Sequence, residues 1–215
     1  MSTYDWLIIS LICVAGATTP GPSLLVIVYI NNHEGMISGI IASIAHGIGI
    51  FIYALISIYA ISFINKNLPT ITPTLQLTGA LFLIFISYKM IFFKPSEKIF
   101  QNNLQVSKKY LGSFLLGLTI SIINPKILIF LTSVFSQFIN DELSDYTKIG
   151  IGLLAGIIDA VWYIIVSYSV NLKKLREYII LKQKLVFFIF GIILITISIY
   201  LVHVSIRYFI ESFII

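Results

Sequence analysis

Three ionisable side chains lie deep inside apolar stretches of this sequence and are the residues most able to do chemistry: His46, Lys126 and Asp159. A Lys or Asp at the centre of a bilayer costs about 2.5–3.5 kcal/mol on insertion scales, so we expect all three to face the protein interior. Asp159 could carry a proton, because desolvation favours the neutral form of a carboxyl group. It could instead bind the open backbone of a broken helix, or form an ion pair with Lys126.

The other two groups also have both a functional and a structural interpretation. His46 could relay protons, since imidazole titrates near neutral pH, or it could be a core histidine bound to a neighbouring hydroxyl. Lys126 could bind a substrate carboxylate, helped by the partial positive charge of a helix N-terminus, or it could neutralise Asp159 permanently. The residues expected to support these groups, at helical spacing on the same faces, are Gly156, Tyr163 and Tyr53.

Two proline-containing stretches interrupt apolar segments of the chain. Proline lacks an amide donor and clashes with the preceding turn, so it kinks or breaks a helix. Because lipid offers no hydrogen bonds, such a break persists at membrane depth only where the backbone is buried in protein or lines a cavity. The polar side chains there could bind a ligand or only satisfy open carbonyls. The candidate binding residues are Thr18, Thr19, Pro20, Gly21, Pro22, Ser23, Asn124, Pro125 and Lys126.

The composition identifies the elements that position these residues as membrane helices. The chain has 215 residues, of which 58% are hydrophobic and 11% charged, with a mean hydropathy of +1.00. A soluble domain is about 25% charged, and a spanning helix needs about 20 apolar residues. We predict an all-α polytopic membrane protein with one transmembrane domain over residues 1–215. The expected spans are Trp6–Ile30, Met36–Ile64, Leu75–Phe93, Tyr110–Ile139, Ile149–Val170 and Leu185–Arg207.

The charges in the connections predict the orientation of the chain. Ten of the 14 basic residues lie in or beside two connections, 94–109 and 171–184, and the positive-inside rule assigns such connections to the cytoplasm. The net charge of +5 is therefore attributed to orientation in the lipid bilayer, and no nucleic acid is expected as a partner. With six spans both termini would lie outside, whereas a re-entrant first segment would leave the N-terminus inside.

The chain divides into two halves of three spans, about 1–93 and 110–215, joined by the cytoplasmic connection 94–109. An odd number of spans in each half requires opposite orientations, which predicts an inverted repeat with broken first and fourth helices. Paired breaks in inverted halves are typical of the binding site of a secondary transporter. We expect the two breaks to meet near the bilayer midplane, within reach of Asp159. Each proline could instead only kink its helix.

Several other chemistries lack the residues that they need. Cys13 is the only cysteine, which excludes an intramolecular disulfide and a dithiol redox motif. We expect no cofactor, no metal site and no enzymatic activity; the alternatives are an ion or metal exporter on the same scaffold, or an intramembrane enzyme. The spacings Gly35–Gly39 and Gly152–Gly156 permit close helix contact, within one chain or in a homodimer.

The order and spacing of four segments are similar to the signatures of the LysE/RhtB family of amino-acid exporters. These segments are Thr19–Pro22, Leu77–Leu83, Gly117 with Asn124–Lys126 and the run to Phe138, and Gly156–Tyr163. The resemblance covers nearly the whole chain. It implies export of amino acids or related small zwitterionic metabolites across the cytoplasmic (inner) membrane by a multi-pass protein. The substrate carboxylate is then expected near Lys126, with Asp159 and His46 as the candidates for coupling.

Overall fold

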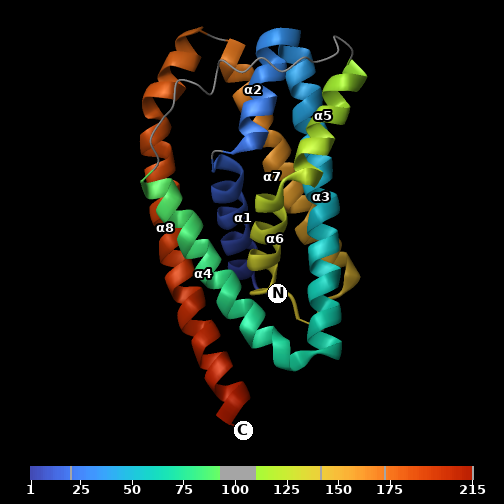
Figure 1. Cartoon of the computed structure of the whole chain (residues 1–215), viewed down its shortest axis with the longest axis vertical. Helices are drawn as coiled ribbons and strands as arrows, with labels where there is room; N and C mark the ends of the chain where they lie inside the picture. The colour runs from blue at the N-terminus through green and yellow to red at the C-terminus, as the bar shows by residue number, and fades with distance from the viewer. Residues whose placement is uncertain (20, 93–109, 141, 172, 215) are drawn as a thin grey trace.

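The computed structural model describes residues 1–19, 21–92, 110–140, 142–171 and 173–214, and the side chains in these ranges except at 171–183 and 211–214. All regular structure within these ranges is helical, and the helices form one elongated bundle (Figure 1). The helices are α1 Thr3–Thr18, α2 Pro22–Glu34, α3 Met36–Asn67, η1 Pro69–Ile71, α4 Thr72–Ile91, α5 Tyr110–Ile123, α6 Pro125–Phe135, α7 Asp145–Asn171 and α8 Lys173–Ile214.

Four helical stretches are long and apolar enough to cross a membrane: α3, η1 with α4, α7 over Asp145–Val170, and α8 over Lys184–Ile210. Two pairs of shorter helices complete the bundle, since α1 and α2 meet at 61° and α5 and α6 at 58°. If each bent pair is one span, the total is six. The predicted class, an all-α polytopic membrane protein, is confirmed. The inverted relation of the two halves stays a prediction.

Two predicted connections are helical instead. Residues Asn31–Glu34 continue α2, so that only Gly35 separates it from α3, at a φ of 93° that favours glycine. Helix α8 begins at Lys173, inside the connection expected at 171–184. A helix can extend past the hydrocarbon core because its backbone hydrogen bonds are internal. Polar residues in the sequence therefore do not mark the end of a helix. The connection 94–109 lies outside the described residues.

Helix α3 presents lipid-facing and protein-facing residues on opposite sides. Its exposed apolar side chains recur at helical spacing and include Ile44, Ile48, Ile52, Ile56, Tyr59 and Phe63. Its buried side includes small residues together with His46. An apolar stripe of this length on the outside of a helix would be unusual in water, and a lipid environment accounts for it.

Helices α3 and α7 approach closely where two glycines face each other. A Cβ at Gly156 would lie 2.8 Å from the carbonyl oxygen of Gly47, and a Cβ at Gly47 would lie 2.6 Å from that of Gly156. Residues without a side chain let two membrane helices touch through their backbones. His46 precedes Gly47 and Asp159 follows Gly156 by three residues, so this contact brings the two ionisable side chains opposite each other.

Replacing Gly156 with valine is expected to destabilise the protein by about 1–3 kcal/mol, the usual cost of overpacking a tight contact. The neighbouring substitution Ile157→Val is the matched control, because Ile157 is 59% exposed on the outer face of α7. Thermal unfolding of the purified protein in detergent measures the difference. Equal midpoints for the two variants would contradict the close approach of α3 and α7.

Candidate functional site

The first break is stabilised at one side and left open at the other. The hydroxyls of Thr18 and Thr19 donate to the carbonyl of Ala15, at 2.9 and 2.7 Å, which satisfies the C-terminus of α1. Helix α2 begins with Pro22 at its first turn, and no side chain caps it. Its first amides therefore carry the partial positive charge of an uncapped helix N-terminus. Pro20 lies outside the described residues.

The second break follows the rules of helix capping. Asn124 is the N-cap of α6, and its Oδ1 accepts a hydrogen bond of 3.1 Å from the backbone amide of Lys126. Pro125 occupies the first helical position, where its missing amide donor costs nothing. The Asn-Pro pair thus ends α5 at Ile123 and starts α6 in a new direction.

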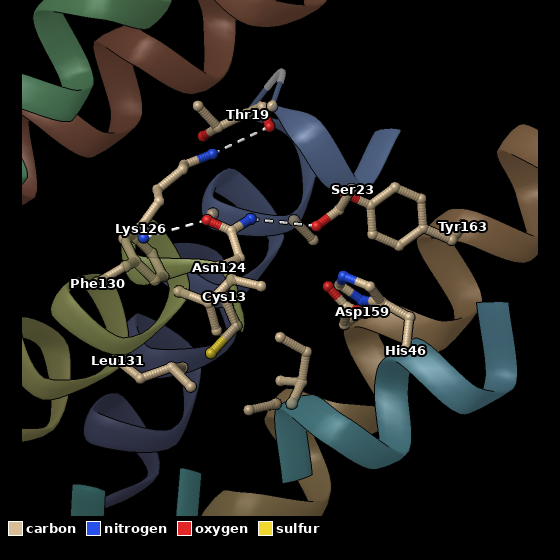
Figure 2. A pocket seen from close by; sticks show the side chains of 16 residues that line it. Cys13, Thr19, Ser23, His46, Asn124, Lys126, Phe130, Leu131, Asp159 and Tyr163 are labelled. Atoms are coloured by element: carbon tan, nitrogen blue, oxygen red, sulfur yellow. Dashed lines mark hydrogen bonds and ion pairs between the residues drawn. The ribbon is translucent and has the colours of Figure 1, made fainter. Parts of the chain in front are cut away.

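The two breaks contact each other, as the sequence predicts. The side-chain amide of Asn124 donates to Ser23 Oγ at 3.3 Å, and Lys126 Nζ donates to the carbonyl of Thr19 at 3.2 Å. Lys126 and the His46–Asp159 pair lie on opposite sides of the site in Figure 2, with Asn124 and Ser23 between them. Four segments that are distant in sequence therefore converge on one point.

Asp159 binds His46 and not Lys126. His46 Nδ1 and Asp159 Oδ2 are 2.6 Å apart, and the two residues are 1% and 6% exposed. The alternatives of a Lys126–Asp159 pair and of a histidine bound to a hydroxyl are therefore wrong for this structure. Tyr163 packs edge-on against the imidazole, with ring centroids 4.8 Å apart. A buried acid–imidazole pair of this kind can hold and pass on a proton.

A cavity of about 50 Å³ lies between the breaks and this pair. Eight of the predicted site residues line it: Thr19, Gly21, Ser23, His46, Asn124, Lys126, Asp159 and Tyr163. The remaining lining residues were not predicted, and they are Cys13, Gly16, Ala17, Ile50, Ile127, Phe130, Leu131 and Ala155. Helical spacing from the breaks could have identified some of these, since Phe130 follows Lys126 by one turn and Cys13 precedes the first break by under two.

Five other predicted residues lie outside the cavity lining. Thr18, Pro22 and Pro125 shape the breaks, and Gly156 makes the contact with Gly47 described above. The hydroxyl of Tyr53 donates to the carbonyl of Ile122, near the end of α5. Tyr53 thus satisfies backbone next to the second break. Among the described residues, no three His, Cys, Asp or Glu side chains gather as a metal site would require.

The arrangement sets the ammonium group of Lys126 against the carboxyl group of Asp159 across a small cavity. The ammonium group of Lys126 has three donors, and among the described residues it makes one hydrogen bond, to the carbonyl of Thr19. A Cβ at Gly21 would lie in ordinary van der Waals contact with Lys126 Nζ, at 3.6 Å, so the ammonium group lies beside the start of α2. Gly16 makes room for the ring of Phe130 on the same wall. The cavity therefore has an ammonium group on one wall and a carboxyl group on the other.

Comparison with known proteins identifies over nearly the whole chain the family that the sequence motifs resemble. The family model for the LysE type translocator matches residues 14–205. The chain is 22% identical over 174 residues to the threonine efflux protein of Escherichia coli strain K12, covering 80% of this chain and 84% of that protein. It is 24% identical over 167 residues to the leucine efflux protein of Salmonella choleraesuis strain SC-B67, covering 77% and 78%. No solved structure matches the chain. The chain belongs to the LysE type translocator family.

Proposed function

We propose that this protein is a secondary transporter that exports a small amino acid across the cytoplasmic membrane, and that the amino acid binds in the cavity between the two helix breaks. One observation carries the proposal: Lys126 and Asp159 face the same small cavity from opposite sides. Related proteins named for the efflux of threonine and of leucine support the substrate class.

The carboxylate of the amino acid would bind at the helix breaks. Lys126 offers a positive charge there, and the uncapped start of α2 offers backbone amides. Anions bind at such helix ends because the open amides and the helix dipole both favour negative charge. The amino group would bind towards Asp159, where the carboxyl group and the hydroxyl of Ser23 are acceptors.

The size of the cavity favours a small substrate. A water molecule needs roughly 10–15 Å³ of such space, so a cavity of about 50 Å³ has room for a few water molecules, and a bound amino acid would have to widen it least if its side chain is small. The aromatic ring of Phe130 and the side chain of Leu131 close one wall and leave no extension for a large side chain. Substrates the size of tryptophan would require the helices to separate.

Access to the cavity would be controlled by two apolar layers of unequal size. A small cluster of Ile27, Ile30, Ala42 and Tyr163 closes the side towards the end of α2. The opposite side is closed by the main core, which includes Cys13, Ile50 and Leu131. Because fewer contacts must be separated, opening towards the end of α2 costs less. The positive charges assign this end to the cytoplasm, from which an exporter must load.

The direct test is efflux from preloaded proteoliposomes, screened over the common amino acids with threonine and leucine included. We expect export of one or more small amino acids, faster when a proton gradient is imposed, and negligible export of tryptophan. Empty liposomes and liposomes with heat-denatured protein are the controls. Absence of efflux for every amino acid, together with thermal stabilisation by a metal ion, would instead support the ion-exporter alternative.

A further inference from the structure

We propose that a file of polar side chains, buried except for the half-buried Glu34, connects the His46–Asp159 pair with Glu34 and carries protons between the cavity and the end of α2, beside the route taken by the substrate. The inference rests on the proposed export function, and it adds the path by which a coupling proton leaves. The file consists of His46, Asp159, Ser43, Ser167, Asn31 and Glu34.

The first part of the file runs along the contact between α3 and α7. Ser43 lies one turn before His46 on α3, and Ser167 lies two turns after Asp159 on α7. Their hydroxyl oxygens are 3.3 Å apart across the helix interface, and both residues have an exposed fraction of 0%. Ser43 also donates to the carbonyl of Gly39 at 2.7 Å. The polar pair thus points from the transport site towards the start of α3.

The next part depends on the absence of a side chain at Gly39. A Cβ at this position would lie 2.6 Å from Asn31 Oδ1 and 2.9 Å from Ser167 Oγ. The side-chain amide of Asn31 on α2 and the hydroxyl of Ser167 on α7 therefore share the space that Gly39 leaves open on α3. Asn31 is 2% exposed, and a polar amide is rarely held so deeply between membrane helices without a role.

The file ends at Glu34, one turn beyond Asn31 on the same face of α2. Glu34 Oε2 accepts a hydrogen bond of 2.7 Å from Ser113 of α5. Its Oε1 is buried and accepts none from the described residues. The neighbouring His33 turns away, with Nδ1 3.0 Å from the carbonyl of Tyr29. One oxygen of the Glu34 carboxyl group thus accepts a hydrogen bond, and the other has no partner among the described residues.

The position of Glu34 suits release of a proton at the cytoplasmic end. Ser113 lies in the first turn of α5, which begins at Tyr110, directly after the lysine-containing connection 94–109. That connection is assigned to the cytoplasm by its charge. A proton delivered to Glu34 would therefore leave on the side from which the substrate enters.

Each step of the transfer moves one proton and changes no other bond. The Asp159 carboxyl gives its proton to His46, and the imidazole passes a proton to the hydroxyl pair of Ser43 and Ser167 through water that enters when the bundle opens. Water next to Asn31 passes it to the open oxygen of Glu34. The other titratable groups close to Asp159, which are Cys13, Lys126 and Tyr163, lie around the cavity.

A separate proton path explains why these polar groups lie beside an apolar cluster. Ile27, Ile30, Ala42 and Tyr163 block the cavity at the same level, so the substrate cannot leave there while that cluster is closed. Protons need only a file of donors and acceptors with transient water. Serines that merely bonded their own helices would not require the buried amide of Asn31 and the half-buried carboxyl group of Glu34 in line with them.

The test uses full-length protein in proteoliposomes with a pH-sensitive dye inside and radiolabelled amino acids from the screen above. We expect Glu34→Gln to slow proton-coupled net export about a hundredfold or more, the scale on which positioned acids and bases act. Exchange of labelled for unlabelled amino acid should stay near the wild-type rate, because exchange needs no proton to leave. Glu142→Gln is the matched control, since Glu142 is an exposed carboxylate between α6 and α7.

The outcomes separate this inference from the export function. If Glu34→Gln exports amino acid and moves protons at the wild-type rates, the path is overturned but the export function stands. The same holds if the wild-type protein exports amino acid without moving protons. No export of any amino acid by the wild type overturns both. If Glu34→Gln also loses exchange, Ser167→Ala decides: slow net export with normal exchange supports the path, and wild-type behaviour overturns it. Restoration of proton movement by Glu34→Asp would further support it.

Discussion

Replacing Asp159 with asparagine is expected to abolish proton-coupled export, while exchange of amino acid continues at saturating substrate because the amide oxygen of asparagine and the hydroxyl of Ser23 still accept hydrogen bonds from the amino group. Asparagine keeps the shape of the side chain and a hydrogen-bonding group for His46 Nδ1, which lies 2.6 Å from Asp159 in the wild type. It cannot take up or release a proton. We expect net export driven by a proton gradient to fall about a hundredfold or more, within the range for loss of an acid or base.

The control for this variant is Asp145→Asn on the same helix. Asp145 lies in the first turn of α7, and its side chain is 73% exposed. Net export and exchange are measured in parallel, because a folding defect would lower both. If net export by Asp159→Asn depends on the proton gradient as it does in the wild type, Asp159 has no role in coupling and only forms a hydrogen bond with His46.

Replacing Lys126 with methionine is expected to weaken substrate binding strongly. Methionine keeps the length and much of the apolar surface of the lysine side chain but removes its charge. Truncating one partner of a buried charge pair costs about 2–5 kcal/mol, and each 1.4 kcal/mol is about tenfold in affinity. We therefore expect the concentration for half-maximal exchange to rise on the order of a hundredfold.

Lys148→Met tests whether such a loss is specific to the site. Lys148 is 8% exposed, so it is also a buried lysine, but it lies near the start of α7 against the ring of Tyr59. Its replacement should leave the half-maximal concentration close to wild type. Similar losses in the two variants would indicate a general effect on folding, and no loss in Lys126→Met would remove this residue from the binding site.

The breaks could be predicted because their causes are local. Pro22 and Pro125 exclude a continuous helix through their own covalent structure, and Asn124 is a preferred N-cap. The need to bury ionisable groups away from lipid also identified Asp159 and His46 from the sequence. These features depend on a few neighbouring residues and on the solvent, and both are known before the fold.

The choice of partners could not be predicted, because it depends on helix packing. Three ionisable groups allow several pairs. The close contact of Gly47 with Gly156 brings His46 and Asp159 together, and these two residues form the pair. The end of α2 was misassigned for a related reason. Asn31 and Glu34 are polar residues typical of a loop. In the bundle, however, Glu34 accepts a hydrogen bond from Ser113 of α5, and Asn31 occupies the space that Gly39 leaves on α3.

The walls of the cavity illustrate a further limit of sequence reasoning. Phe130, Leu131 and Cys13 are ordinary apolar residues in apolar helices, and nothing in their type marks them as lining a site. Phe130 and Leu131 owe their position to the bend of 58° between α5 and α6, and Cys13 on α1 lines the same cavity. Proline predicts that a bend occurs, but its direction is set by the helices that pack around it.

Counterflow with modified substrates tests whether one cavity binds both charged ends of an amino acid. The best exported amino acid is compared with its carboxamide and its N-acetyl derivative, at equal concentrations, in wild-type proteoliposomes. We predict exchange of the amino acid and rejection of both derivatives, because each lacks one of the charges that Lys126 and Asp159 would bind. Exchange of the carboxamide or the N-acetyl derivative at the rate of the amino acid would contradict the binding site described above.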